Sequence, residues 1–185
     1  SQPADVTPGC KRESTADVMI GPGLGIELRR SPFEERLVMP LAERVGGHWY
    51  NYAAWSDDHG NTWQHGQNID DSQVSGMMNE NQVVELTDGR LLMNARHYGG
   101  DPNRLEAHSN DGGATWSSAY VSDLPGTACM ASIIRLADPM DGFTTSRLLY
   151  AGHADAGRDD GTIWVSHDEG LSWGEGALLE PNSFA

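Results

Sequence analysis

Cysteine and basic residues are scarce in this chain of 185 residues. Two cysteines, Cys10 and Cys129, are too few for a disulfide framework, and the sequence leaves open whether they pair or are two buried thiols. The 12 Lys and Arg residues are outnumbered by 27 Asp and Glu residues, so the formal net charge is −15. Because no basic stripe offsets this excess, we exclude nucleic acid as a partner.

Long apolar runs are also missing. No stretch is long enough to span a bilayer, so we expect no transmembrane segment, and no signal peptide opens the chain. Mature secreted proteins lack signal peptides too, so this second absence does not locate the protein. The seven histidines show no metal-ligand spacing. We therefore predict neither a metal nor any other cofactor.

What the chain does contain is one pattern in three copies, Ser-x-Asp-x-Gly-x-Thr/Ser-Trp. The copies begin at Ser56, Ser109 and Ser166, 53 and 57 positions apart (109 − 56 and 166 − 109). A period of this size is typical of an array of similar supersecondary units. In each copy the Asp can accept N–H bonds within a tight turn, Gly supplies a positive φ, and Trp can wedge between neighbouring sheets.

The rest of the chain predicts strands rather than helices. Residues 1–19 are expected to be an irregular polar connection, and strands are expected within 21–28, 36–40, 132–136 and 147–151. Segment 83–94 predicts a hairpin around Asp88 and Gly89, a pair favoured in two-residue turns. No sustained helical periodicity is present. The expected fold class is all-β.

The repeat period indicates a β-propeller. At this period, residues 1–185 supply about three to four blades, whereas roughly four to eight blades close a propeller and six suit a period above fifty. We therefore expect residues 1–185 to be part of a propeller domain. The remainder would then come from the same protein or from a separate segment acting as a partner.

Two charged residues at the open end of the predicted hairpin are candidates for a site. Glu80 and Arg96 each lie eight positions from Asp88, on opposite arms. Whether they share a face depends on a bulge that the sequence does not reveal. The residues alone leave open an ordinary surface ion pair, worth at most about 1 kcal/mol.

Two other motifs predict no ligand. The glycines of segment 21–25 are not followed by Gly-Lys-Ser/Thr or by a helical pattern, which argues against a phosphate-binding loop. Three Asp residues in segment 153–161 could in principle bind calcium, but they do not follow EF-hand spacing. A solvated acidic loop is favoured there.

The three boxes resemble those of the sialidase (neuraminidase) superfamily, where they are called Asp boxes or BNR repeats. Such boxes also occur in propellers with other activities, so they indicate fold before function. Segment 76–96 is more specific, because it resembles the exo-α-sialidase segment in which a catalytic Glu is followed, sixteen residues later, by an Arg that clamps the substrate carboxylate. Segments 21–26 and 36–40 resemble strand entries of bacterial-type sialidases. The resemblance covers essentially the whole chain and implies a six-bladed propeller.

The resemblance also implies roles for three residues. Glu80 would be the base that activates a tyrosine nucleophile, while Arg96 and Arg158 would clamp the substrate carboxylate. Sialidases are the tyrosine-nucleophile exception among retaining glycosidases, and planar guanidinium groups suit a fixed carboxylate. The implied function is a retaining exo-α-sialidase that releases terminal sialic acid from sialylated glycans. A secreted or periplasmic location is expected, with a lysosomal or other compartment left open.

The sequence departs from the family pattern in several places. Neither the first clamp Arg nor the general-acid Asp is recognised before Gly21, the tyrosine is expected just beyond Ala185, and Met130 stands where Gln or Asn is common. The 185 residues alone are therefore expected to be inactive. Two alternatives remain open: a sialic-acid-binding propeller without catalysis, and an Asp-box scaffold for protein interactions.

Overall fold

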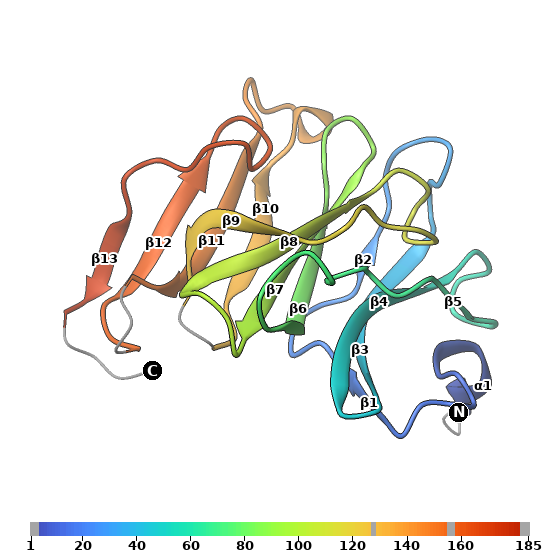
Figure 1. The fold of residues 1–185 in the computed structure, drawn as a ribbon. Coiled ribbons are helices and arrows are strands. Elements are labelled where there is room, and N and C mark those ends of the chain that lie inside the picture. The colour runs from blue at the N-terminus through green and yellow to red at the C-terminus, as the bar shows by residue number, and fades with distance from the viewer. Residues whose placement is uncertain (1–3, 127–128, 155–157, 182–185) are drawn as a thin grey trace.

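Three antiparallel sheets follow one another along the chain and lie side by side (Figure 1). The structure, a computed structural model, describes residues 4–126, 129–154 and 158–181. Each sheet is a blade built from consecutive strands, and β6 of the second blade lies between β3 and β4 of the first blade and β10 of the third. The all-β prediction is confirmed. The two helices of the described chain, α1 (Thr7–Cys10) and a 3-10 turn (Pro139–Asp141), are short.

The first blade has an interrupted first strand. β1 and β2 both pair with β3, at opposite ends of it, and residues 21–25 separate them. The blade therefore counts as four-stranded although five strands are assigned: β1 (Asp17–Ile20), β2 (Ile26–Glu27), β3 (Leu37–Val45), β4 (His48–Ser56) and β5 (Gln64–His65).

The second and third blades are regular four-stranded meanders. The second consists of β6 (Met77–Glu85), β7 (Leu91–Tyr98), β8 (Asn103–Ser109) and β9 (Tyr120–Pro125). The third consists of β10 (Ser132–Ala137), β11 (Arg147–His153), β12 (Gly161–Ser166) and β13 (Ala177–Glu180). The strands expected within 132–136 and 147–151 are confirmed as an antiparallel pair.

The expectation of an irregular segment 1–19 is wrong for α1 and β1. The segment is held to the first blade by the carboxylate of Glu43 in β3, which is 1% exposed. Arg12 and Thr15 donate hydrogen bonds to it, and the Arg12 guanidinium also lies over the Tyr52 ring. Because these partners lie in β3 and β4, no local pattern indicates that this segment is ordered.

The hairpin turn is also longer than predicted. Leu86 and Arg90 still pair, through a bond from Leu86 N–H to Arg90 O of 2.7 Å, so the loop is the three residues 87–89. Gly89 has φ of +85° and closes it, as in a hairpin with a type I turn followed by a left-handed residue. The prediction of a two-residue turn is therefore wrong, because an Asp-Gly pair suits both loop lengths.

The three Asp boxes form the same hydrogen bonds. In the first, the Asp58 carboxylate accepts bonds from the N–H of Thr62 at 2.8 Å and from its hydroxyl at 2.7 Å, and Ser56 Oγ accepts from the N–H of Gly60. Asp111 and Asp168 do the same in the other two. The bonds from Thr62 lower the pKa of Asp58 to about 2. The boxes are structural turns, as expected.

The box tryptophans pack against the apolar clusters of the sheets. Trp63 packs against the outer face of the first blade and Trp173 against the cluster between the second and third blades, while Trp116 contacts two clusters. The cluster between the second and third blades contains Leu92 and Leu148. Burying this apolar surface holds neighbouring blades together.

Two other expectations concern membranes and disulfides. Within the described ranges, no helix has both the length and the apolar character needed to cross a membrane. Cys10 and Cys129 are both free thiols. They belong to different blades: Cys10 lies in α1 on the first blade, and Cys129 lies just before β10 of the third. The structure therefore shows two separate thiols and no disulfide between them.

Candidate active site

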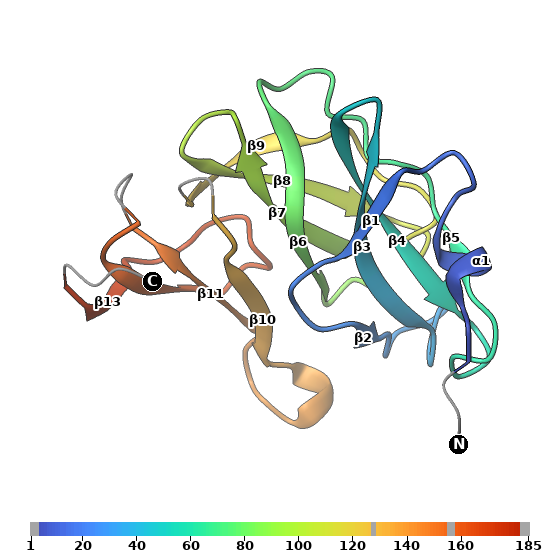
Figure 2. The same ribbon diagram turned by 90° about the horizontal axis from the view of Figure 1, so that it is seen from below.

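Glu80 and Arg96 meet at the end of the second blade opposite its Asp box. Figure 2 views the molecule from below, the side at which β6 and β10 begin. The register of β6 and β7 shifts between Met78 and Asn81, so Asn79 and Glu80 form a β-bulge opposite Arg96. Glu80 Oε2 then lies 2.9 Å from Arg96 NH1. The bulge that the sequence left undecided is thus present, and the two side chains share a face.

The local surroundings hold this pair at the rim of the blade. The Glu80 and Arg96 side chains are 24% and 19% exposed. The Glu80 N–H donates to Asn79 Oδ1 at 2.8 Å, and the Arg96 guanidinium lies 5.0 Å from the centre of the Tyr98 ring. The Nε of Arg96 is buried and has no hydrogen-bond partner among the described residues. The partly exposed remainder of the Arg96 side chain is what a ligand could reach.

Sequence reasoning missed a buried polar layer beside this pair. Arg104 is fully buried, and its Nε donates to Asn94 Oδ1 at 2.8 Å. Asn94 Nδ2 in turn donates to Glu106 Oε1 at 2.8 Å, and the Tyr120 hydroxyl donates to Glu106 Oε2 at 3.1 Å. The signal was available: Arg104 and Glu106 alternate with apolar residues in β8, which places two charges on one face of a central strand.

Burial shifts the pKa values of both charged residues in this layer. Desolvation lowers the pKa of Arg104 and raises the pKa of Glu106. Nearby groups, Glu106 among them, act against the lowering of the Arg104 pKa. Hydrogen bonds donated by Asn94 and Tyr120 act against the raising of the Glu106 pKa. The layer thus depends on internal pairing, because neither group reaches bulk water.

The pairing of β10, β11 and β12 puts the loop that carries Arg158 at the same end of the fold. β10 runs alongside β6, since Gln82 Oε1 accepts from the N–H of Ile133 and Arg135 donates to the carbonyl of Glu85. His153 pairs with Gly161, so the β11–β12 loop emerges near the beginning of β10. Arg158 lies in this loop with φ of +63°. Residues 155–157 of the predicted acidic loop lie outside the described residues.

A pocket of about 450 Å³ lies at this end of the second and third blades, and neither Glu80 nor Arg96 lines it. It starts at Gln82, two positions from Glu80 on the same face of β6, and extends over the third blade. Most of its lining is apolar or small, including Met130, Ala151 and Leu179. The described residues contain no group of three or more His, Cys, Asp or Glu side chains placed to hold a metal ion.

Comparison with known proteins places the chain in a family. Residues 13–184 match the family described as BNR repeat-like domain. The chain belongs to this family. Relatives of this BNR repeat-like domain include a sialidase of Micromonospora viridifaciens, 34% identical over 188 residues, which cover 94% of this chain and 28% of that protein. An anhydrosialidase of Macrobdella decora is 30% identical over 167 residues, which cover 87% and 21% of the two chains.

Solved structures agree with the fold of the BNR repeat-like domain. The structure of a Hadza microbial sialidase, Hz136, matches with a TM-score of 0.82 and 26% identity, over 98% of this chain and 34% of that one. The predictions of the sialidase family and of a propeller fold are therefore confirmed. The chain spans about a third or less of the length of each of these relatives.

Proposed function

We propose that the protein containing this chain is a retaining exo-α-sialidase that acts on sialylated glycans. The observation that carries the proposal is the partly exposed Glu80–Arg96 pair, joined at 2.9 Å, in a chain of the sialidase family. Glu80 is the proposed base, and Arg96 and Arg158 are the proposed ligands of the substrate carboxylate. A secreted or periplasmic location is part of the same proposal.

The chemistry of the substrate explains these assignments. Sialic acid carries a carboxylate on its anomeric carbon, so a carboxylate nucleophile would approach against that charge. A neutral phenol avoids the repulsion, but it needs a base to accept its proton. Glu80 is suited to this because Arg96 orients its carboxylate. Two guanidinium groups can hold the substrate carboxylate in fixed geometry by charge-assisted bonds.

The test is the variant Glu80→Gln in the full-length protein. We expect release of sialic acid from a sialoside to fall by a factor on the order of 100 or more, as for loss of a positioned base, with an unchanged circular dichroism spectrum. Glu34→Gln, an exposed residue at the other end of the blades, is the control. Wild-type turnover in Glu80→Gln would contradict the assignment.

The products of the same assay separate the related possibilities. Because one relative is named an anhydrosialidase, the released sugar should be weighed: an anhydro product is lighter than free sialic acid by one water. A protein that binds sialosides and releases nothing would instead be a sialic-acid-binding propeller. One that binds no sialoside would be an interaction scaffold.

A further inference from the structure

The polar layer of the second blade is arranged in rows across its strands. The register places Gln82 opposite Asn94, Asn94 opposite Glu106, and Glu106 opposite Tyr120. One step nearer the site, Arg96 and Arg104 each lie one position beyond the last paired residues of β7 and β8, Ala95 and Leu105, and Glu80 binds Arg96 from β6. These three side chains form a second row beside the first. Both rows lie on the face of the second blade that packs against the third blade, the same face that carries Leu92.

Arg104 links these rows to the third blade through two of its guanidinium nitrogens. It has no exposed surface, its Nε donates to Asn94 on β7, and its NH1 donates to the carbonyl of Cys129 at 2.6 Å. Gly126 lies against its side chain, so closely that a Cβ there would be 2.1 Å from Arg104 Cδ. The Arg104 guanidinium therefore binds both β7, the strand that carries Arg96, and the segment that leads into β10.

The charges in the rows explain why these contacts matter. Arg96 and Arg104 carry like charges at neighbouring positions of one face, which is unfavourable unless carboxylates compensate it. Glu80 beside Arg96 and Glu106 in the next row supply two negative charges, and both lie within electrostatic reach of Arg104. The set Glu80, Arg96, Arg104 and Glu106 is thus formally neutral. Removing Arg104 would leave Glu106 buried without its nearest positive charge.

We propose that Arg104 is a positioning residue of the site, an inference that rests on the proposed sialidase function. It keeps β7 and the Cys129 carbonyl at a fixed separation, and so holds Arg96 and Glu80 in register with the segment that brings Met130 into the pocket. The two bonds use different nitrogens of a planar fork. A lysine, with one ammonium group, cannot reproduce this geometry.

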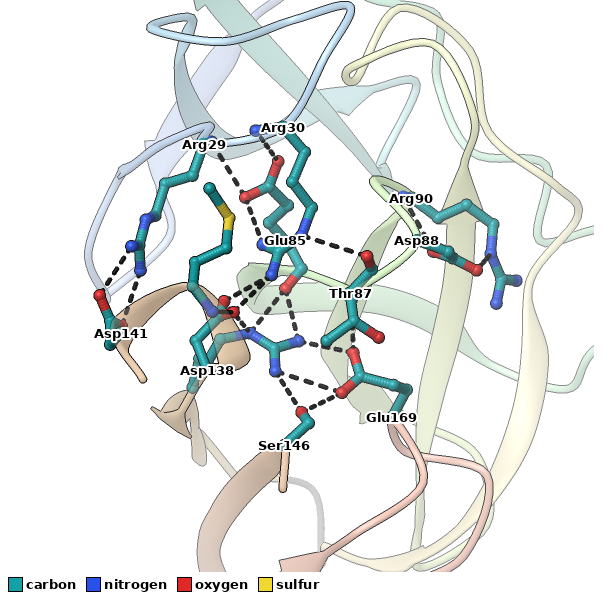
Figure 3. Close-up of polar contacts among 12 residues, drawn as sticks. Arg29, Arg30, Glu85, Thr87, Asp88, Arg90, Asp138, Asp141, Ser146 and Glu169 are labelled. Atoms are coloured by element: carbon teal, nitrogen blue, oxygen red, sulfur yellow. Dashed lines mark hydrogen bonds and ion pairs between the residues drawn. The ribbon is translucent and has the colours of Figure 1, made fainter. Parts of the chain in front are cut away.

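A matched control lies at the opposite end of the same blades. Arg30 is 11% exposed, and it binds Glu85 of the second blade and Asp138 of the third (Figure 3). It resembles Arg104 in bridging blades by several hydrogen bonds, but it belongs to the Asp-box end. Arg30→Lys and Arg104→Lys should therefore both lower stability, whereas only Arg104→Lys should alter the site.

The experiment compares the full-length wild-type protein with Arg104→Lys, Arg104→Gln and Arg30→Lys. We expect both Arg104 variants to lose roughly 10- to 100-fold in kcat, because a misplacement of about 1 Å in an active site can cost about 100-fold. KM should change less than kcat, because a displaced Arg96 keeps its charge for the substrate carboxylate whereas a displaced Glu80 loses its position as base. Arg30→Lys should keep wild-type kcat at temperatures where it is folded. Equal kcat in the Arg104 and Arg30 variants would overturn the proposal.

A crystal structure of Arg104→Lys gives a readout that does not depend on activity. We expect the Arg96 NH1–Glu80 Oε2 contact of 2.9 Å to be lost or lengthened and the Cys129 carbonyl to shift. An unchanged site would refute the positioning role. If both Arg104 variants fail to fold while Arg30→Lys folds, Arg104 serves folding and the proposal is wrong. Lack of activity in the wild type would contradict the proposed function alone.

Discussion

Arg30 and Asp138 lie in different blades, yet the NH2 group of Arg30 is 2.7 and 2.6 Å from the two carboxylate oxygens of Asp138. The Asp138 side chain has no exposed surface, and it also accepts the N–H of Met140. Arg30 binds Glu85 of the intervening blade as well, at 3.1 Å. One side chain from the first blade therefore joins all three (Figure 3).

This relationship predicts how stability depends on pH. Burial by itself would raise the pKa of Asp138, but the bonds from Arg30 and Met140 outweigh it, and the pKa is lowered. A carboxyl group of this kind contributes stability above its unfolded pKa of about 3.9 and loses it as pH falls through the folded value. The free energy of unfolding should therefore decrease below about pH 4.

Asp138→Asn should remove part of that dependence. At pH 7 we expect the variant to be less stable by about 2 kcal/mol, because Arg30 loses its charge-assisted bonds to Asp138 and keeps only Glu85 as a counter-charge. The difference should shrink at low pH. Urea unfolding at neutral and acidic pH measures both effects, with Asp141→Asn in the exposed Arg29 pair as control. A constant difference across pH would mean that Asp138 is not the titrating group.

The second Asp box predicts a purely structural effect. Asp111→Ala removes the acceptor of the Thr115 N–H and hydroxyl, and we expect the free energy of unfolding to fall by about 2 kcal/mol. Asn110→Ala changes an exposed position of the same turn and should have little effect. Thermal unfolding of the two variants tests this. Equal melting temperatures would show that the carboxylate does not hold the turn.

Arg96→Lys should change the preference for a sialoside with a free carboxylate over its methyl ester. If Arg96 binds the substrate carboxylate with paired bonds, lysine keeps the charge but loses the fork, and kcat/KM should fall roughly 10- to 100-fold, or about 1.4 to 2.7 kcal/mol. The methyl ester of the same sialoside lacks that charge, so its kcat/KM should change much less. Equal losses on both substrates would mean that Arg96 acts through Glu80 and not on the carboxylate.

Much of the fold was predictable because its signals are local. The boxes at Ser56, Ser109 and Ser166 are complete within eight residues each, and they mark the turn between the third and fourth strands of every blade. Glu80 and Arg96 could be paired because a hairpin fixes the separation of its arms. The roles of Glu80, Arg96 and Arg158 in binding or catalysis stay predictions.

Other features were not predictable from local pattern. The bulge at Asn79 and Glu80 depends on how β6 pairs with β7, and the anchoring of Arg12 depends on a carboxylate 31 positions away. The alternation in β8 places Arg104 and Glu106 on one face, but only the packed structure shows that both are buried. Each of these outcomes is decided by a partner distant in the sequence.

The all-β class, the three boxed turns and the hairpin that brings Glu80 towards Arg96 follow from the amino-acid order alone. Hydrogen bonds within a turn and the alternation of side chains along a strand are set by neighbouring residues, so they can be read without coordinates. Only the tertiary structure decided which charges are buried and which pairs join blades. Burial and long-range pairing arise when whole sheets pack, and desolvation then makes each buried charge depend on its partner.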